Sequence, residues 1–307
     1  MQHRFSTRTL TRTYGTTFYA SLASLVLAVA SLVTVGQAQA SSKGPIVQKA
    51  AAIEEQLQAR VGVAVIDTAS GQSWLYKADE RFPMASTAKT LVCAALLQQG
   101  EPLLHSPVLL QPDDIQTYAP VTKELVGQTM SAFQLCEITL RSSDNTAVNL
   151  VLNVVGGPSA VTSFLRRIGD QVTRLDRLEP EVNEAKPGDE RDTTTPAAMA
   201  ATMRALLLDS ALNPTMRAQL VEWLKANDVA GPLLRAGVPS DWVVADRSGS
   251  AEYGTRGVAA VMWPTQHAPI VAAVYITETD APIEARNAAI ASIGQAIAEE
   301  LSLLPNK

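Results

Sequence analysis

The sequence is poor in the residues that build most metal centres, nucleic-acid surfaces and histidine-based active sites. Its 307 residues include two cysteines and three histidines, 5% are aromatic, and the net charge is −5. An acidic chain with few aromatic side chains lacks the basic surface that attracts nucleic acid. Neither cysteine has a histidine at zinc-binding spacing. The sequence therefore predicts no metal or other cofactor and no nucleic-acid partner.

A second absence concerns the N-terminus, where no acidic residue occurs before Glu54. Three early arginines are followed by an apolar stretch from about Ala20 to Val35, which ends at the small-x-small site Ala38–Ala40. This pattern is typical of a secretory signal peptide. The stretch is shorter than the roughly 20 residues of a membrane-spanning helix. We predict that residues 1–40 are a signal peptide cleaved after Ala40, with no membrane attachment afterwards. An uncleaved anchor is the alternative.

The two cysteines, Cys93 and Cys136, both follow the predicted signal peptide. In an oxidising compartment such a pair fits a disulfide, and two buried free thiols are the alternative that the residues leave open. A disulfide across a loop of this length contributes around 4 kcal/mol on the chain-entropy account.

Residues 41–307 carry strand patterns at both ends and helical spacings between them. Alternating valines favour a strand over 60–67, and a turn leads to a second strand over 72–77, so a hairpin is predicted. Elsewhere, apolar residues recur either at helical spacing or in short strand-like runs. Helices are predicted over 46–59, 88–97, 131–141, 145–155, 159–168, 196–208, 214–226 and 281–303, and further strands over 242–247, 258–264 and 270–277.

This order predicts an α/β (α+β) fold, in which an antiparallel sheet is built from both chain ends, flanked by helices, and carries an inserted all-helical subdomain. We expect the α/β subdomain to comprise residues 41–82 and 226–307, and the helical subdomain residues 83–225. A polar, aperiodic stretch lies between residues 170 and 195. Such a long loop inside a compact domain is usually functional.

Candidate chemistry begins with Ser86-Thr87-Ala88-Lys89, at the start of a predicted helix. The spacing places Lys89 one turn after Ser86 on the same face, within reach of its hydroxyl. A serine hydroxyl becomes a nucleophile when a base takes its proton, and a helix N-terminus favours negative charge that develops beside it. On its own, however, this pattern more often marks a capping serine and a solvated lysine.

Two further motifs have equally ordinary explanations when each is taken alone. Ser143-Asp144-Asn145 lies between two predicted helices, where these residue types often serve as caps. Arg247-Ser248-Gly249 lies at the end of a predicted strand, where polar residues and glycine commonly lead from a strand into a turn. Their order and spacing after Ser86 and Lys89 have no such ordinary explanation.

In this order the three motifs resemble those of penicillin-binding enzymes and class A β-lactamases. The last motif normally reads Lys-Thr-Gly or Lys-Ser-Gly, so Arg247 is a departure. Within class A, arginine at this position is a feature of the carbenicillin-hydrolysing branch, which the run Ala245–Gly249 resembles. A fourth run, Arg177–Asn183, is similar to the Arg-x-Glu-Pro-x-x-Asn of the class A omega loop.

The resemblance covers essentially all of residues 41–307, and it implies a role for each matching residue. Ser86 is implied as the nucleophile, with Lys89 or Glu179 as the base that takes its proton. Ser143 is implied to protonate the leaving nitrogen, and Glu179 to direct the hydrolytic water. The remaining implied roles are the oxyanion hole (backbone N–H groups of Ser86 and Ser250), substrate binding (Tyr118, Asn145, Asn183, Arg247, Ser248, Gly249 and Arg256), a disulfide (Cys93 and Cys136) and a salt bridge that closes the loop (Arg177 and Asp192).

The implied activity is hydrolysis of the β-lactam amide of penicillins, including carboxypenicillins, which confers antibiotic resistance. We expect a periplasmic monomer whose partner is a small-molecule β-lactam. A D-Ala-D-Ala peptidase shares the first three motifs but generally lacks the Glu179 loop, and it is the alternative. A Ser-His-Asp esterase is disfavoured because the sequence has no Gly-x-Ser-x-Gly elbow.

Overall fold

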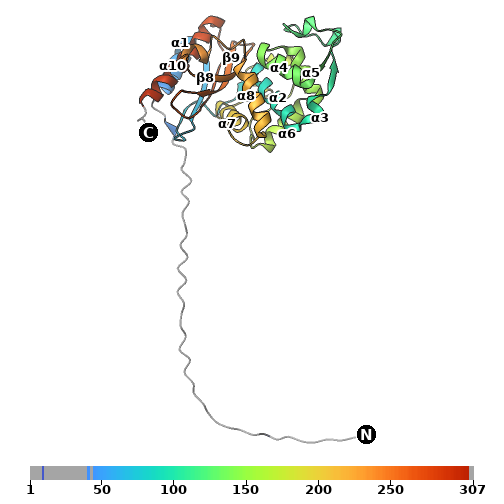
Figure 1. The fold of residues 1–307 in the computed structure, drawn as a ribbon. Coiled ribbons are helices and arrows are strands. Elements are labelled where there is room, and N and C mark those ends of the chain that lie inside the picture. Colours follow the sequence, from blue (N-terminus) through green and yellow to red (C-terminus); the bar gives the residue numbers. More distant parts are fainter. Residues whose placement is uncertain (1–8, 10–39, 42–43, 304–307) are drawn as a thin grey trace. The chain divides into compact units, whose positions relative to one another are not determined.

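The computed structural model describes residue 9, residues 40–41 and residues 44–303 (Figure 1). The predicted signal peptide therefore lies almost entirely outside the described residues. Within residues 44–303, no single helix is both long and apolar enough to cross a membrane. Two consecutive helices over 145–167 reach the length and apolar composition of a membrane span only when they are taken together, and the pair is bent by 68°.

A six-stranded sheet takes its strands from both ends of the chain, as the sequence predicted. The order is β1-β3-β2-β10-β9-β8, and all neighbours are antiparallel except the short pair β1–β3. The predicted hairpin is the pair β2–β3. The strands are β1 (Ala40–Ser41), β2 (Arg60–Asp67), β3 (Ser73–Tyr76), β8 (Val243–Ala251), β9 (Thr255–Trp263) and β10 (Ile270–Thr277).

Both faces of this sheet are covered, which explains why its central strand is apolar throughout. Every residue of β10 is buried. The even-numbered residues from Ile270 to Ile276 face a core shared with α1, α9 and α10, and the odd-numbered residues from Val271 to Tyr275 face the second, larger core. The helices on the first face are α1 (Pro45–Leu57), α9 (Leu234–Gly237) and α10 (Ile283–Leu303).

The middle of the chain forms helices around α2, which contacts α4, α5, α6 and α8 (Figure 1). Residues 88–97 of α2 are all buried, and apart from Lys89 and Thr90 they are apolar on every side of the helix. The Cys93–Cys136 disulfide, with Cα atoms 5.6 Å apart, joins α2 to α4. These helices are α2 (Ala88–Gln99), α3 (Glu101–Leu104), α4 (Ala132–Ser142), α5 (Asn145–Val155), α6 (Pro158–Arg167), α7 (Pro196–Leu207) and α8 (Pro214–Lys225).

The ends of these helices follow local sequence signals. In α7, Thr195 accepts a hydrogen bond from the backbone of Ala198, and in α8, Asn213 accepts one from Met216. Both caps are followed by a proline, whose missing N–H costs nothing at this position. The predicted helices are confirmed to within a few residues at each end. The division into two subdomains at residues 82–83 and 225–226 stays a prediction.

Strand β8 is longer than the sequence predicted, and this corrects the placement of the third motif. We expected a strand that ends at Arg247, but β8 continues to Ala251, in register with β9 as far as Thr255. Residues 248–251 lack the apolar pattern of a strand, yet their backbones pair with β9 because ladder hydrogen bonds do not depend on side chains. Arg247-Ser248-Gly249 is thus held inside the sheet.

Two glycines make room for an aromatic pair next to the start of α2. Tyr275 of β10 lies in register between Gly62 of β2 and Gly257 of β9, and its ring centroid is 6.1 Å from that of Phe82. A Cβ on Gly257 would lie 2.5 Å from the Tyr275 ring, and one on Gly62 would lie 2.4 Å from the Phe82 ring. Neither glycine can therefore be replaced without movement of a buried ring.

We expect Gly257→Ala to destabilise the fold by about 1–3 kcal/mol, the usual cost of overpacking a core. At this chain length, that corresponds to a fall in Tm of about 2–4 °C for each kcal/mol. Gly231→Ala is the matched control, because nothing lies within 4 Å of a Cβ at that position. Thermal unfolding of both variants checks the prediction, and equal Tm values would contradict it.

Candidate active site

Ser86 lies in a sharp turn that the sheet holds in place. The turn is a 3₁₀ helix, η1 (Ala85–Thr87), directly before α2, and Ala85 within it has a positive φ of 46°. Strand β8 passes so close that a Cβ on Gly249 would lie 2.9 Å from the backbone nitrogen of Ser86. Since only glycine permits this approach, Gly249 brings the edge of the sheet against the Ser86 turn.

Lys89 is a buried cation at the centre of the candidate site. Its Nζ donates to Asn145 Oδ1 at 2.6 Å and to the carbonyl oxygen and Oγ of Ser143 at 2.7 and 3.2 Å, and it lies 3.2 Å from Glu179 Oε1. Burial lowers the pKa of Lys89 to about 8, against the attraction of Glu179 and aided by the nearby Arg247 cation. Burial therefore favours the neutral amine, the form that can accept a proton.

Ser143, rather than Lys89, makes the hydrogen bond to Ser86. Ser143 Oγ donates to Ser86 Oγ at 3.2 Å and accepts from Lys89 Nζ. The sequence placed Lys89 within reach of Ser86, but among the described residues no hydrogen bond joins these two side chains. The ammonium instead contacts the acceptors of Ser143, Asn145 and Glu179. The three side chains Ser86, Ser143 and Lys89 form one continuous polar path.

The Ser143-Asp144-Asn145 segment is held by its buried central carboxylate. Ser143 ends α4 in the left-handed region, with φ 67°, and Asp144 caps the start of α5 by accepting from the backbone of Ala147. Asp144 also accepts three hydrogen bonds from Val121 and Thr122. The predicted cap is therefore present, and it fixes the two flanking side chains against Lys89.

Glu179 is the second charged group of the site, and it is 5% exposed. Its Oε2 accepts a hydrogen bond from Asn183 Nδ2, while Oε1 faces Lys89. Asn149 of α5 holds its backbone on both sides, since Oδ1 accepts from the N–H of Glu179 at 2.9 Å and Nδ2 donates to its carbonyl at 2.8 Å. The carboxylate is thus fixed between the lysine and the asparagine.

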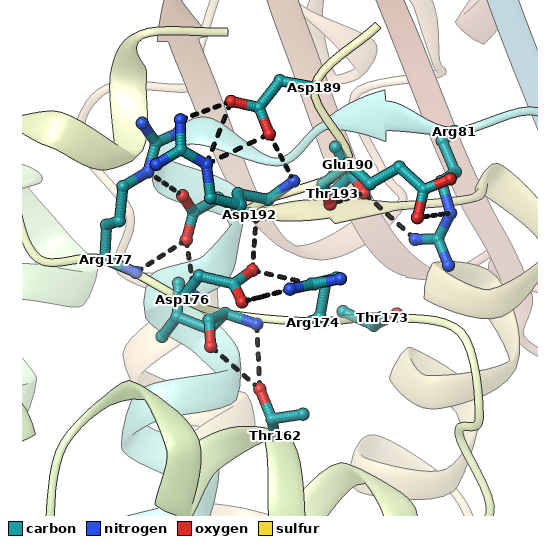
Figure 2. Close-up of polar contacts among 12 residues, drawn as sticks. Arg81, Thr162, Thr173, Arg174, Asp176, Arg177, Asp189, Glu190, Asp192 and Thr193 are labelled. Carbon is teal, nitrogen blue, oxygen red and sulfur yellow. Dashed lines mark hydrogen bonds and ion pairs between the residues drawn. The ribbon is translucent and has the colours of Figure 1, made fainter.

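Ion pairs close the loop that carries Glu179 (Figure 2). The buried carboxylate of Asp192 accepts from Arg177 Nε at 2.6 Å and from the backbone nitrogens of Asp176 and Arg177 at 2.7 and 3.0 Å. Asp176 in turn accepts from the backbone of Asp192 and pairs with Arg174. Burial opposes the charge on Asp176, but the Arg174 guanidinium lowers the pKa of this carboxyl. The predicted pair Arg177–Asp192 is therefore part of a larger network.

The opposite end of the site carries two buried guanidinium groups. Arg256 donates to Asn287 Oδ1 at 2.8 Å and to the carbonyl of Gly249 at 3.2 Å. Burial lowers the pKa of both Arg247 and Arg256 to about 10, so both remain charged at neutral pH. Within residues 44–303, neither group has a carboxylate within salt-bridge distance. This end of the site therefore attracts an anion.

A cleft of about 500 Å³ joins these groups. Most of the predicted site residues line it, whereas the buried side chains of Lys89, Glu179 and Arg247 do not. The side chain of Tyr118 is half exposed at the rim. The lining residues are Ser86, Tyr118, Ser143, Asn145, Asn183, Val229, Ser248, Gly249, Ser250, Ala251, Glu252 and Arg256.

The sequence analysis did not single out three asparagines that orient the charged groups. Asn149 holds Glu179, Asn287 holds Arg256, and Asn227 contacts Arg247. The only local hint was a polar residue within the apolar face of a predicted helix, as for Asn149. No spacing rule links Asn227 or Asn287 to its partner, because the pairs are 20 and 31 residues apart.

A buried serine–lysine path, a carboxylate on a closed loop and a cationic end of the cleft are together the features of a serine hydrolase. Among the described residues, no group of three or more histidine, cysteine or acidic side chains is arranged to hold a metal ion. Comparison with known proteins gives the family. The model for the β-lactamase enzyme family matches residues 45–301.

The chain belongs to that family, and to its class A serine branch. It is 46% identical to β-lactamase PSE-4 of Pseudomonas aeruginosa over 263 residues, which cover 85% of this chain and 91% of the relative. It is also 46% identical to β-lactamase CTX-M-8 of Citrobacter amalonaticus over 255 residues, 82% and 88% of the two chains. An ancestral class A β-lactamase superposes with a TM-score of 0.81 at 51% identity, covering 83% of this chain and 99% of that one. The protein is a β-lactamase, and the D-Ala-D-Ala peptidase alternative is not favoured.

We expect Arg177→Ala to loosen the loop by about 3 kcal/mol, because the buried Asp192 carboxylate loses its guanidinium partner. Hydrogen exchange should become faster for the amides of residues 176–192, with little change in α2. Arg191→Ala is the control, since the pair Arg191–Asp189 lies at the surface of the same loop. Equal exchange in the two variants would contradict a special role for the buried pair.

Proposed function

We propose that this β-lactamase hydrolyses penicillins, carboxypenicillins included, through an acyl-enzyme on Ser86. The observation that carries the proposal is the unbroken contact from the Ser86 hydroxyl through Ser143 to Lys89 and Glu179, beside the cleft. The partner is a small β-lactam. Opening of its ring inactivates the antibiotic, so the enzyme provides resistance.

Acylation begins when Ser86 Oγ attacks the lactam carbonyl carbon. We assign removal of the hydroxyl proton to Lys89 through Ser143 or to Glu179 through a water molecule, and the contacts of Ser143 with Ser86 and Lys89 support the first route. The Ser143 hydroxyl then gives a proton to the lactam nitrogen as the carbon–nitrogen bond breaks. The pKa of Lys89 near 8 suits such a shuttle, because the amine gains and loses a proton near neutral pH.

We assign the oxyanion hole to the backbone N–H groups of Ser86 and Ser250. The first lies at the nucleophile, and the second lies on β8 directly after Gly249, which brings the strand against the Ser86 turn. Each donor of this kind typically contributes about 10²–10³ in rate. The glycine contact therefore sets the spacing between the two donors.

We assign deacylation to Glu179, which directs a water at the acyl carbonyl while Asn183 orients the carboxylate. Asn145 is assigned to the amide side chain of the substrate, and Tyr118 to the wall beside it. Ser248, Gly249 and Arg256 line the cationic end of the cleft and are assigned to the substrate carboxylate. Arg247 contributes its charge from its buried position.

The choice of carboxypenicillins rests on Arg247, where most class A sequences have lysine. A guanidinium stays charged and carries fixed donors, so it favours a substrate with a second carboxylate.

Export is also part of the proposal: residues 1–40 direct the chain to the periplasm and are removed after Ala40, and the enzyme then acts as a monomer.

Replacing Glu179 with Gln tests the catalytic assignment. The amide keeps the shape of the side chain but cannot take a proton, so deacylation should slow by about 10²–10⁴. Mass spectrometry after mixing with benzylpenicillin should show a stable adduct on Ser86. Glu181→Gln is the control, because Glu181 is exposed on the same loop. Rapid turnover by Glu179→Gln without an adduct would reject the assignment.

Replacing Arg247 with Lys tests the substrate preference. Both residues carry the charge, so binding of the shared carboxylate should largely cancel when carbenicillin is compared with benzylpenicillin. A guanidinium contact that is lost is worth about 1–3 kcal/mol, which is roughly five- to 150-fold in relative kcat/KM. Arg235→Lys is the control, because the Arg235 guanidinium is already paired with the carboxylate of Asp246. An equal fall in kcat/KM for both penicillins would mean that other residues set the preference for carbenicillin.

A further inference from the structure

Arg247 is a buried cation with very few partners. It is fully buried, and one nitrogen, Nη1, donates a long hydrogen bond of 3.4 Å to Asn227 Oδ1. Its Nε and Nη2 have no hydrogen-bond partner among the described residues. A buried charge is normally paired, because desolvation of an ion is costly. The site thus keeps a cation whose charge is left largely uncompensated.

The two carboxylates whose charges act on Arg247, those of Asp246 and Glu179, are already bonded to other cations. Asp246 lies on the opposite face of β8 and accepts from Arg235 at 2.8 and 3.1 Å. Glu179 contacts Lys89 on the other side of the site. Arg247 is therefore left with the amide of Asn227 as its partner within residues 44–303.

Asn227 is fixed so that its two ends face opposite charges. It is 5% exposed and follows α8 by two residues. Its Nδ2 donates to the backbone carbonyl and Oδ1 of Asp246 at 2.9 and 3.2 Å, while its Oδ1 accepts from the backbone of Val229 and from Arg247. An amide serves here because it can donate to a carboxylate and accept from a cation without charge of its own.

We propose that Asn227 is a specificity-determining, positioning residue: it holds the Arg247 guanidinium without neutralising it, and so preserves the positive field that favours a doubly anionic β-lactam. The inference rests on the proposed binding of penicillin carboxylates at the cationic end of the cleft. Val229, two residues on, lines that cleft, so the Asn227 loop reaches the site directly. A carboxylate at position 227 would face Arg247 with one oxygen and offset its charge, while its other oxygen would replace the Nδ2 group that donates to Asp246.

The test is Asn227→Asp, which keeps the size of the side chain and adds a negative charge. We expect its Ki for carbenicillin, measured by competition against a chromogenic cephalosporin, to rise about three- to 30-fold more than its Ki for benzylpenicillin. An unchanged ratio of the two Ki values in folded protein would overturn the proposal. Competition reports binding, so a wild type that binds carbenicillin without turning it over would reject the proposed activity and leave this inference standing.

Asn227→Leu separates the charge from the shape. It removes the acceptor but adds no charge, so we expect a rise of about three- to tenfold in Ki for both penicillins with their ratio unchanged. Because it is neutral, this variant also provides a test if Asn227→Asp does not fold, which circular dichroism would show. If Asn227→Leu shifts the ratio as strongly as Asn227→Asp, or leaves both Ki values unchanged, the proposal fails.

Discussion

The contact set around the Lys89 ammonium is the interaction on which the rest of the site depends. This one buried amine touches Ser143, Asn145 and Glu179, which come from two separate segments of the chain. A buried ammonium is tolerated only where acceptors surround it, so the segments that supply them must be held rigidly. The capped Ser143–Asn145 turn and the closed loop around Glu179 meet that requirement. Because these acceptors surround the ammonium, Lys89 contacts Ser143, and the Ser143 hydroxyl makes the hydrogen bond to Ser86.

The fold supplies this rigidity through close approaches of backbone as well as through charge. Gly249 lets β8 touch the Ser86 turn, and Gly257 lets the buried Tyr275 ring pack beside it. The hydroxyl of Tyr275 lies 3.0 Å from that of Thr87, the residue after Ser86. Because the site is built on β8, the η1 turn and α2, its geometry is held by regular structure. Hydrogen-bond donors that stabilise a transition state must be held in place in this way before the substrate binds.

The spacing of apolar residues predicted most of the fold, because burial in the two cores requires helical spacing in the helices and short apolar runs in the strands. The helices of the middle segment and the strands of both ends showed their apolar spacing directly. The motifs singled out Ser86, Lys89 and Glu179, whose side chains the structure brings into one set of contacts through Ser143 and Lys89. Side-chain geometry was not predictable in the same way. The extension of β8 beyond Arg247 depends on backbone pairing with β9, and the role of Asn149 depends on a contact with a loop 30 residues away. Such long-range contacts leave no local sequence signal.

The charges of the site form an arrangement that is costly for the empty protein and favourable for its ligand. On one side, Lys89 and Glu179 compensate each other. On the other, Arg247 and Arg256 lie buried among neutral partners, and the pKa of each guanidinium is lowered by burial. Burial of unpaired cations destabilises a fold, but it leaves their field directed at the cleft instead of cancelling it internally. In the function proposed above, the substrate carboxylate supplies the missing charge when it binds. Part of the stability that the fold gives up is thereby recovered as affinity for that carboxylate, close to Ser86, which is proposed to attack the lactam carbonyl.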